Sequence, residues 1–380
     1  MTEFAQDIRF ALRTLAKTPA FTALAVVTIA LGIGANTAVF SMVNGVLLRR
    51  LPYAGDDRLI HIVQPSSTRP DVGFSVPEIL DYRAQARELA AVSEYHSMPF
   101  QLYGRGEPQR VQTGVVSDNF FNMLGIRPLV GRLFLPGEEA VGAAPVVVLS
   151  YGYWMDHFGG DPTIVGQHFT MNDRVHTIVG VLPPLPVYPD ANDMWMPAGA
   201  CPFRSEANHM ADRRGRMLNM YAVIRPGTSF DAAASGLQVV SQRLHSSYAE
   251  SYPAARKLSI GAVPLRQELT QSSRPLFLTL LATATFVLLI AAANFANLTL
   301  ARQMRRTREV ALRSALGASR ARIFRQLATE SLCVTLSGGM LGLLIAWSGL
   351  GLLRTFATRV TPRAQEITLD FAVLGFAIAV

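Results

Sequence analysis

Two long segments without a charged residue enclose a short, strongly basic loop, and this pattern constrains the fold more than any other part of the chain. No Asp, Glu, Lys or Arg occurs between Arg274 and Arg302, or between Glu330 and Arg354. An α-helix needs about 20 apolar residues to cross the hydrocarbon core of a membrane, so each segment is long enough to span one. Hydrophobic residues make up 50% of the chain, which also favours an integral membrane protein.

The loop between these segments, residues 302–330, carries eight arginines against two glutamates. By the positive-inside rule, a short loop of this charge lies in the cytoplasm. Good helix formers and a Glu309–Arg313 pair at the favoured spacing predict a short helix up to Leu316. Gly317 is expected to end this helix, and Ser319 to cap a second helix that rises into the membrane.

The charge pattern alone leaves two interpretations of this loop open. It either only fixes the membrane topology and touches lipid headgroups, or it offers a surface to a soluble cytoplasmic partner. Nucleic acid is not an expected partner. The net charge of +8 is concentrated beside a membrane span, and no zinc-finger, RNA-binding or helix-turn-helix pattern accompanies it.

The N-terminal part predicts a first membrane helix behind an interfacial one. Residues 1–18 place apolar side chains near one helical face, which is typical of a helix at the membrane surface. Residues 19–48 carry no charge and are too long for a typical signal-peptide core, so an uncleaved anchor is favoured over a signal peptide. The Gly32–Asn36 stretch superficially resembles a nucleotide-binding loop, but no strand precedes it. We expect close helix packing through small residues there.

No stretch between these spans is apolar enough to cross a membrane, so residues 49–273 are expected to form an extracytoplasmic domain. Its local signals alternate between strand and helix, which predicts an α+β fold. Ser75 and Glu78 make a capping box, and Ser150 is expected to cap a helix over 151–158. A further helix over 231–248 is predicted with the following inward-facing residues: Leu237, Val240, Leu244 and Tyr248.

Three segments of the chain carry a resemblance to a known family. The run ANFANLTLARQMRRTREVALRSALGASRARIFRQLATESL, residues 293–332, resembles FtsX-like permeases of the MacB type, which belong to ABC transporter systems. Residues 19–53 resemble the N-terminal membrane helix of the large bacterial permeases that lack a fused ATPase, and residues 145–183 resemble the MacB-like periplasmic core domain. The resemblance implies an α-helical membrane protein with a large α+β extracytoplasmic domain inserted between its first and second membrane helices.

The resemblance also implies that the short helix of the basic loop docks on an ATPase subunit. ATP would be bound by that partner, and this chain would need no cofactor of its own. Carried over residue by residue, the ATPase-coupling contacts fall on Arg308, Glu309, Val310, Ala311, Arg313, Leu316, Gly317 and Ala318. ATP hydrolysis by the partner would then move the periplasmic domain, a process called mechanotransmission.

The expected setting is the bacterial inner membrane, with the N-terminus in the cytoplasm and the large domain in the periplasm. Besides the ATPase and membrane lipids, the resemblance implies a second copy or second permease half, and a periplasmic adaptor. Efflux of peptides or hydrophobic compounds, lipoprotein release and control of cell-wall hydrolases all stay open. The alternative from another class is a membrane-anchored periplasmic binding or signalling protein without an ATPase.

Catalytic motifs are absent from the sequence, so we expect no enzyme. No Walker A or HExxH pattern occurs, and the seven histidines lack metal-ligand spacing, although a site assembled only by the tertiary structure stays open. Cys201 is expected outside the cytoplasm and Cys333 inside a membrane helix, so the two cannot pair. Cys201 is therefore predicted to be a buried, unpaired thiol.

The predicted organisation ends in an incomplete element. Its segments are an interfacial helix (1–18), a first span (19–48), the periplasmic domain (49–273), a second span (274–301), the coupling segment (302–329), a third span (330–353), a short periplasmic loop (354–369) and the start of a fourth span (370–380). About ten residues cannot cross a hydrocarbon core of ~30 Å. We therefore expect a fragment or an early-terminated version of a longer permease.

Overall fold

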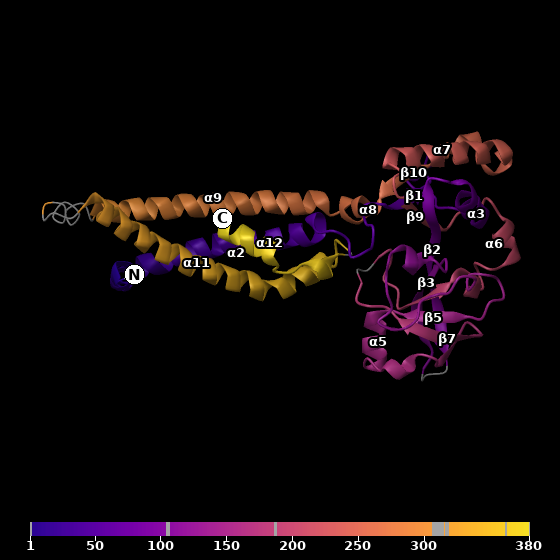
Figure 1. Ribbon diagram of the computed structural model, residues 1–380, viewed down its shortest axis with the longest axis horizontal. Helices are drawn as coiled ribbons and strands as arrows, with labels where there is room; N and C mark the ends of the chain where they lie inside the picture. The colour runs from indigo at the N-terminus through magenta and orange to yellow at the C-terminus, as the bar shows by residue number, and fades with distance from the viewer. Residues whose placement is uncertain are drawn as a thin grey trace. The chain divides into compact units, whose positions relative to one another are not determined.

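The computed structural model describes residues 2–103, 107–185, 188–305, 315, 319–361 and 363–379. The chain divides into two compact units. One is an α+β unit, Arg50–Leu269, and the other is a helical unit made of Met1–Arg49 and Thr270–Val380 (Figure 1).

The helical unit consists of long helices and short connecting turns. Its elements are α1 (Thr2–Lys17), α2 (Pro19–Val43), which continues as a π-helical turn (Asn44–Leu48), α9 (Arg274–Arg305), α11 (Arg320–Ala357), a 3-10 turn (Ala364–Glu366) and α12 (Phe371–Ala379). Pro19 occupies the first turn of α2, where its missing N–H costs nothing, and this separates α2 from α1.

Three of these helices are long and apolar enough to cross a membrane: Pro19–Leu48, Arg274–Met304 and Ala321–Ala357. Large apolar side chains such as Phe286 on α9 and Trp347 on α11 are exposed, as suits a lipid environment. Two helices extend beyond the uncharged segments. α9 runs on to Arg305, and α11 begins at Arg320, directly after the predicted cap Ser319, because arginine is also a good helix former.

α2 is the centre of the helical unit, since it packs against both α9 and α11. Small residues make this packing close. A Cβ atom added at Gly34 would lie 2.9 Å from the carbonyl oxygen of Gly342, and one added at Gly342 would lie 2.9 Å from that of Ala30. The small-residue packing predicted for the Gly32–Asn36 stretch is confirmed. The Asn36 side-chain amide also donates a hydrogen bond to the carbonyl oxygen of Ala284 on α9, at 2.7 Å.

The α+β unit is built on a mixed sheet. Its strands are β1 (Leu59–Val63), β2 (Leu89–Tyr103), β3 (Gln109–Val116), β4 (Val130–Gly131), β5 (Val146–Leu149), β6 (His168–Met171), β7 (Arg174–Val181), β8 (Met194–Pro197), β9 (Asn219–Ile224) and β10 (Gly261–Pro264). The strand order is β10-β1-β9-β2-β3-β8-β5-β7-β4, and β6 pairs with β2 and β7. The β3–β8 and β5–β7 pairs are parallel, and the other pairs are antiparallel.

Helices cover this sheet at both ends of the strand order. They are α3 (Val76–Gln85), α4 (Phe120–Met123), α5 (Tyr151–Phe158), α6 (Ala207–Ala211), α7 (Phe230–Ser247) and α8 (Leu265–Gln271). Figure 1 shows α3 and α7 beside β1, β9 and β10, and α5 beside β5 and β7. Each group has its own apolar core, and the long strand β2 joins them.

The two helix caps predicted for the α+β unit are confirmed, whereas one predicted inward-facing residue is wrong. The Ser75–Glu78 capping box opens α3, and the Ser150 hydroxyl accepts from the backbone N–H of Tyr153 at the start of α5. Tyr248, however, does not face inward. α7 ends at Ser247, so Tyr248 leaves the helical face, and its 41% exposed ring lies 3.6 Å below the guanidinium carbon of Arg213.

Candidate functional site: the charged ends of the helical unit

The eight residues predicted to contact an ATPase, from Arg308 to Ala318, lie outside the described residues. Before this segment α9 ends at Arg305, and after it α11 begins at its N-cap, Ser319. There the Ser319 hydroxyl accepts a hydrogen bond from the backbone N–H of Arg322, at 3.3 Å, which confirms the predicted cap. The coupling contacts themselves stay a prediction.

Charged side chains connect α1 and α2 with α9 and α11, the two helices that flank this segment. Arg325 of α11 donates its Nε hydrogen to Asp7 of α1, with a distance of 2.7 Å to Oδ2. Arg302 of α9 lies 3.8 Å from Glu330 of α11. Its guanidinium carbon also stands 4.5 Å from the centre of the Phe21 ring on α2, which is a cation–π contact. These ion pairs and the cation–π contact thus hold the four helices together at this end of the unit.

A small cavity opens among these contacts. Residues of α2, α9 and α11 line it: Phe21, Phe295, Thr299, Arg302, Gln303, Leu327, Glu330, Ser331 and Val334. Since three helices supply the lining, the shape of this cavity depends on how those helices are placed relative to one another.

At the other end of the helical unit, a fully buried arginine holds the chain that follows α11. Arg363 donates to the carbonyl oxygens of Val46 and Arg49, at 2.6 and 2.9 Å, and to the Glu366 carboxylate at 2.7 Å. Val46 lies in the π-helical turn that follows α2 and Arg49 caps it, at a helix end where carbonyl oxygens lack intrahelical partners. The segment predicted as a polar loop, 354–369, is therefore folded onto the end of α2, and the first part of it continues α11 to Ala357.

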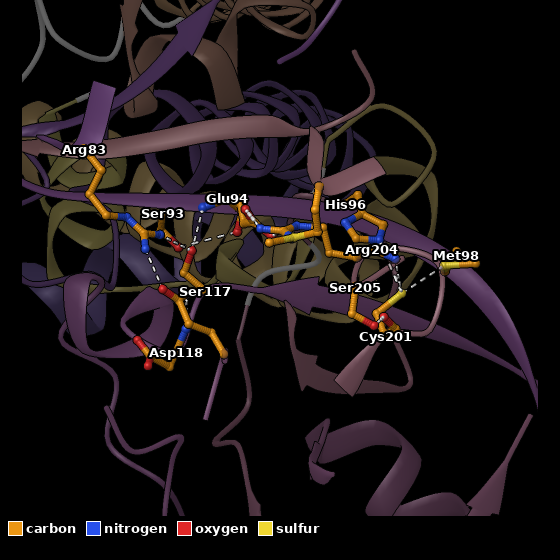
Figure 2. Close-up of polar contacts among 12 residues, drawn as sticks. Arg83, Ser93, Glu94, His96, Met98, Ser117, Asp118, Cys201, Arg204 and Ser205 are labelled. Atoms are coloured by element: carbon orange, nitrogen blue, oxygen red, sulfur yellow. Dashed lines mark hydrogen bonds and ion pairs between the residues drawn. The ribbon is translucent and has the colours of Figure 1, made fainter. Parts of the chain in front are cut away.

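The α+β unit buries charge in its interior. Arg204 forms a two-point ion pair with Glu94, at 2.6 and 2.8 Å, and their side chains are only 8% and 2% exposed (Figure 2). Arg216 pairs with Glu78 at 3.0 Å, and both of these side chains are also buried, at 3% and 0% exposed. No local pattern in the sequence predicts these pairs, because their partners are 110 and 138 positions apart.

A second cluster lies beside the Glu94–Arg204 pair. The Cys201 sulfur is 3.9 Å from His96 Nε2 and 3.6 Å from the Met98 sulfur (Figure 2). Burial lowers the pKa of His96 to about 4, and the Arg204 charge acts in the same direction. Burial raises the pKa of the Cys201 thiol. Cys201 is free and buried, as predicted, and in the described part of the chain no three or more His, Cys, Asp or Glu residues gather as a metal site.

Curated proteins that resemble this chain are export proteins. The macrolide export ATP-binding/permease protein MacB of Bdellovibrio bacteriovorus is 24% identical over 83% of this chain and 47% of its own length. The pyoverdine export ATP-binding/permease protein PvdT of Pseudomonas syringae pv. tomato is 25% identical over 77% of this chain and 44% of its own. The chain thus spans about half the length of these relatives. The solved periplasmic region of MacB from Actinobacillus actinomycetemcomitans aligns with 59% of this chain and 92% of its own, at 13% identity and a TM-score of 0.42.

Two family models divide the chain between them. Residues 22–240 match the MacB-like periplasmic core domain, and residues 281–380 match the FtsX-like permease C-terminal domain. The first match alone covers more than half of the chain, and the second is to a permease domain. The chain therefore belongs to the MacB/FtsX-like family of ABC transporter permeases.

Proposed function

We propose that this chain is the permease part of an exporter in which ATP hydrolysis on a partner subunit moves the periplasmic domain. The observation that carries this proposal is the set of contacts at the two ends of the coupling segment. Asp7, Phe21, Arg302, Arg325 and Glu330 join α1, α2, α9 and α11 there. A force applied to the chain between α9 and α11 would therefore reach all four helices.

The proposed coupling surface consists of residues Arg308–Val310, Ala311, Arg313 and Leu316–Ala318. Arginines in such a segment would speed the encounter with an ATPase subunit that presents an acidic surface. The tight α2–α11 packing through Gly34 and Gly342 would carry the motion along the helices as a rigid body. At the far end, the Arg363 contacts hold α2 to the segment after α11, so both would move together.

We place the N-terminus and the basic loop in the cytoplasm of a bacterial inner membrane, and the α+β unit in the periplasm. The arginine-rich loop supports this orientation through the positive-inside rule. Cysteine labelling in intact cells tests it. A reagent that cannot cross the membrane should modify a cysteine placed at Asp173 and should miss one placed at Ser314. The reverse pattern would overturn the orientation.

For the substrate, we propose efflux of peptides or hydrophobic compounds from the periplasm. The support is the export function in the names of the curated relatives, one for macrolides and one for pyoverdine. A second copy or a second permease half would complete the transporter, and a periplasmic adaptor would receive the substrate. In mechanotransmission the movement of the periplasmic domain would transport the substrate, so no pore through the bilayer is required.

The decisive experiment is affinity purification of the full chain from its native membrane in mild detergent, followed by mass spectrometry and an ATP hydrolysis assay. We expect an ATPase subunit to co-purify, and to be lost when Arg308 and Arg313 are both replaced by Glu. A matched control replaces the exposed Arg87 and Arg110 of the α+β unit by Glu and should keep the ATPase. A folded, inserted chain that never brings an ATPase would instead favour the membrane-anchored binding or signalling protein.

A further inference from the structure

We propose that Cys201, His96 and Met98 form a binding site for one soft monovalent cation of the Cu(I) or Ag(I) class. His96 and Met98 stand two positions apart on β2, so their side chains share one face of the sheet. Cys201 follows the 3-10 turn Ala198–Ala200 directly after β8, and β8 is joined to β2 through β3. The sheet order thus brings the thiol to the same place as the imidazole and the thioether (Figure 2).

The distances between the three side chains suit a shared metal ion. A metal bonds to sulfur at about 2.3 Å and to imidazole nitrogen at about 2.0–2.1 Å, so two ligand atoms around one ion lie about 3.6–4.0 Å apart. The Cys201 sulfur is 3.9 Å from His96 Nε2 and 3.6 Å from the Met98 sulfur. An ion can therefore bridge these atoms with only small side-chain movements.

The His96 imidazole is placed to act as a metal ligand through Nε2. Its side chain is buried, with the residue only 7% exposed, and its Nε2 points at the Cys201 sulfur. Among the described residues its Nδ1 has no hydrogen-bond partner.

Charge balance selects a monovalent ion. The Glu94–Arg204 pair beside the cluster is internally neutral. On binding, the Cys201 sulfur forms a bond to the metal and its proton passes to the solvent, so the site gains one negative charge. One thiolate with a neutral imidazole and a thioether cancels a single positive charge. A divalent ion would leave a net charge buried, which is strongly unfavourable.

Ligand softness points to the same metals. Thiolate and thioether sulfur select Cu(I) and related soft ions over the hard ions that carboxylates prefer. The backbone N–H of Arg204 donates to the Cys201 sulfur at 3.4 Å and would help to fix the thiolate. Met98 is only half-buried, which gives an ion a way in from the surface. This site is independent of the proposed ATPase coupling.

The test is a titration of the full chain in detergent micelles with Cu(I), in competition with a chromophoric Cu(I) chelator and without oxygen. We expect the purified chain to bind one equivalent. Met98→Leu, which keeps the side-chain volume, should weaken binding about tenfold or more, and Cys201→Ser should abolish it. The controls are Cys333→Ser and Met210→Leu, which remove the other cysteine and a nearby methionine and should bind as the wild type does.

X-ray absorption of the Cu(I)-loaded wild type gives a measurement that does not depend on any variant folding. It should show two sulfur atoms and one nitrogen around the metal. Unchanged affinity in both Met98→Leu and Cys201→Ser, a metal surrounded only by nitrogen or oxygen, or retention of Zn²⁺ as tightly as Cu(I) would each overturn the proposal.

Discussion

The two units of this permease use opposite packing strategies. In the α+β unit, large apolar side chains are turned inward, and Trp195 is only 6% exposed. In the helical unit they are turned outward, and Trp347 is 67% exposed. Burial from water holds the first unit together. Lipid is as apolar as the helices, so the second relies on close backbone contact through small residues such as Gly34 and Gly342.

The placement of charge differs in the same way. The α+β unit keeps two Arg–Glu pairs inside its core, where each charge faces an opposite one. The helical unit keeps its charges at its two ends, in the Arg302–Glu330 contact and around Arg363. A charge in the middle of a lipid-facing helix would be too costly, whereas a folded core can shield a charge that is fully paired.

The largest expected effect comes from breaking a core pair. Arg204→Met leaves the Glu94 carboxylate buried without its partner, and we expect a loss of about 3–5 kcal/mol in the free energy of unfolding. Urea unfolding of the full chain in micelles, followed by circular dichroism, measures it. Arg132→Met is the control, because its ion pair with Glu138 is partly exposed and should cost much less. Equal losses in the two variants would mean that burial does not determine how much the Glu94–Arg204 pair contributes to the free energy of unfolding.

A smaller effect is expected from the helix seam. Gly342→Ala places a methyl group against the backbone of α2, and overpacking of this kind costs about 1–3 kcal/mol. Gly349→Ala adds the same methyl group to the same helix where nothing lies within 4 Å, so it should be neutral or slightly stabilising. Thermal melts in detergent compare the two. If both variants behave alike, small-residue packing does not hold α2 to α11.

The α+β unit should also respond to acid. Burial lowers the pKa of His176, so the folded state keeps this side chain neutral to a lower pH than the unfolded state does. The unfolded chain takes up the proton near pH 6.5. The unfolded state therefore binds more protons, and His176 contributes a loss of stability as the pH falls below about 6.5, by at most about 1.4 kcal/mol per pH unit. His96, whose pKa is also lowered, adds to the same loss. His176→Gln should make this part of the unfolding profile less steep, whereas replacing the exposed His168 should not.

The smallest effect is expected at the cytoplasmic end proposed for the helical unit. Asp7→Asn removes the ion pair with Arg325, whose side chain is 42% exposed, so the loss should stay below about 1 kcal/mol. A double-mutant cycle with Arg325→Gln measures the coupling between the two side chains. A coupling of several kcal/mol would show that this end is packed like the core of the α+β unit.

The sequence by itself determined what depends on neighbouring positions. Uncharged runs marked the three long helices, the Ser75–Glu78 pair and the Ser319 cap marked helix starts, and the glycines of the first span predicted close packing. Only the tertiary structure decided which distant groups meet. The Glu94–Arg204 pair and the Cys201–His96–Met98 cluster depend on the order of strands in the sheet, and helix and strand periodicity carries no information about that order.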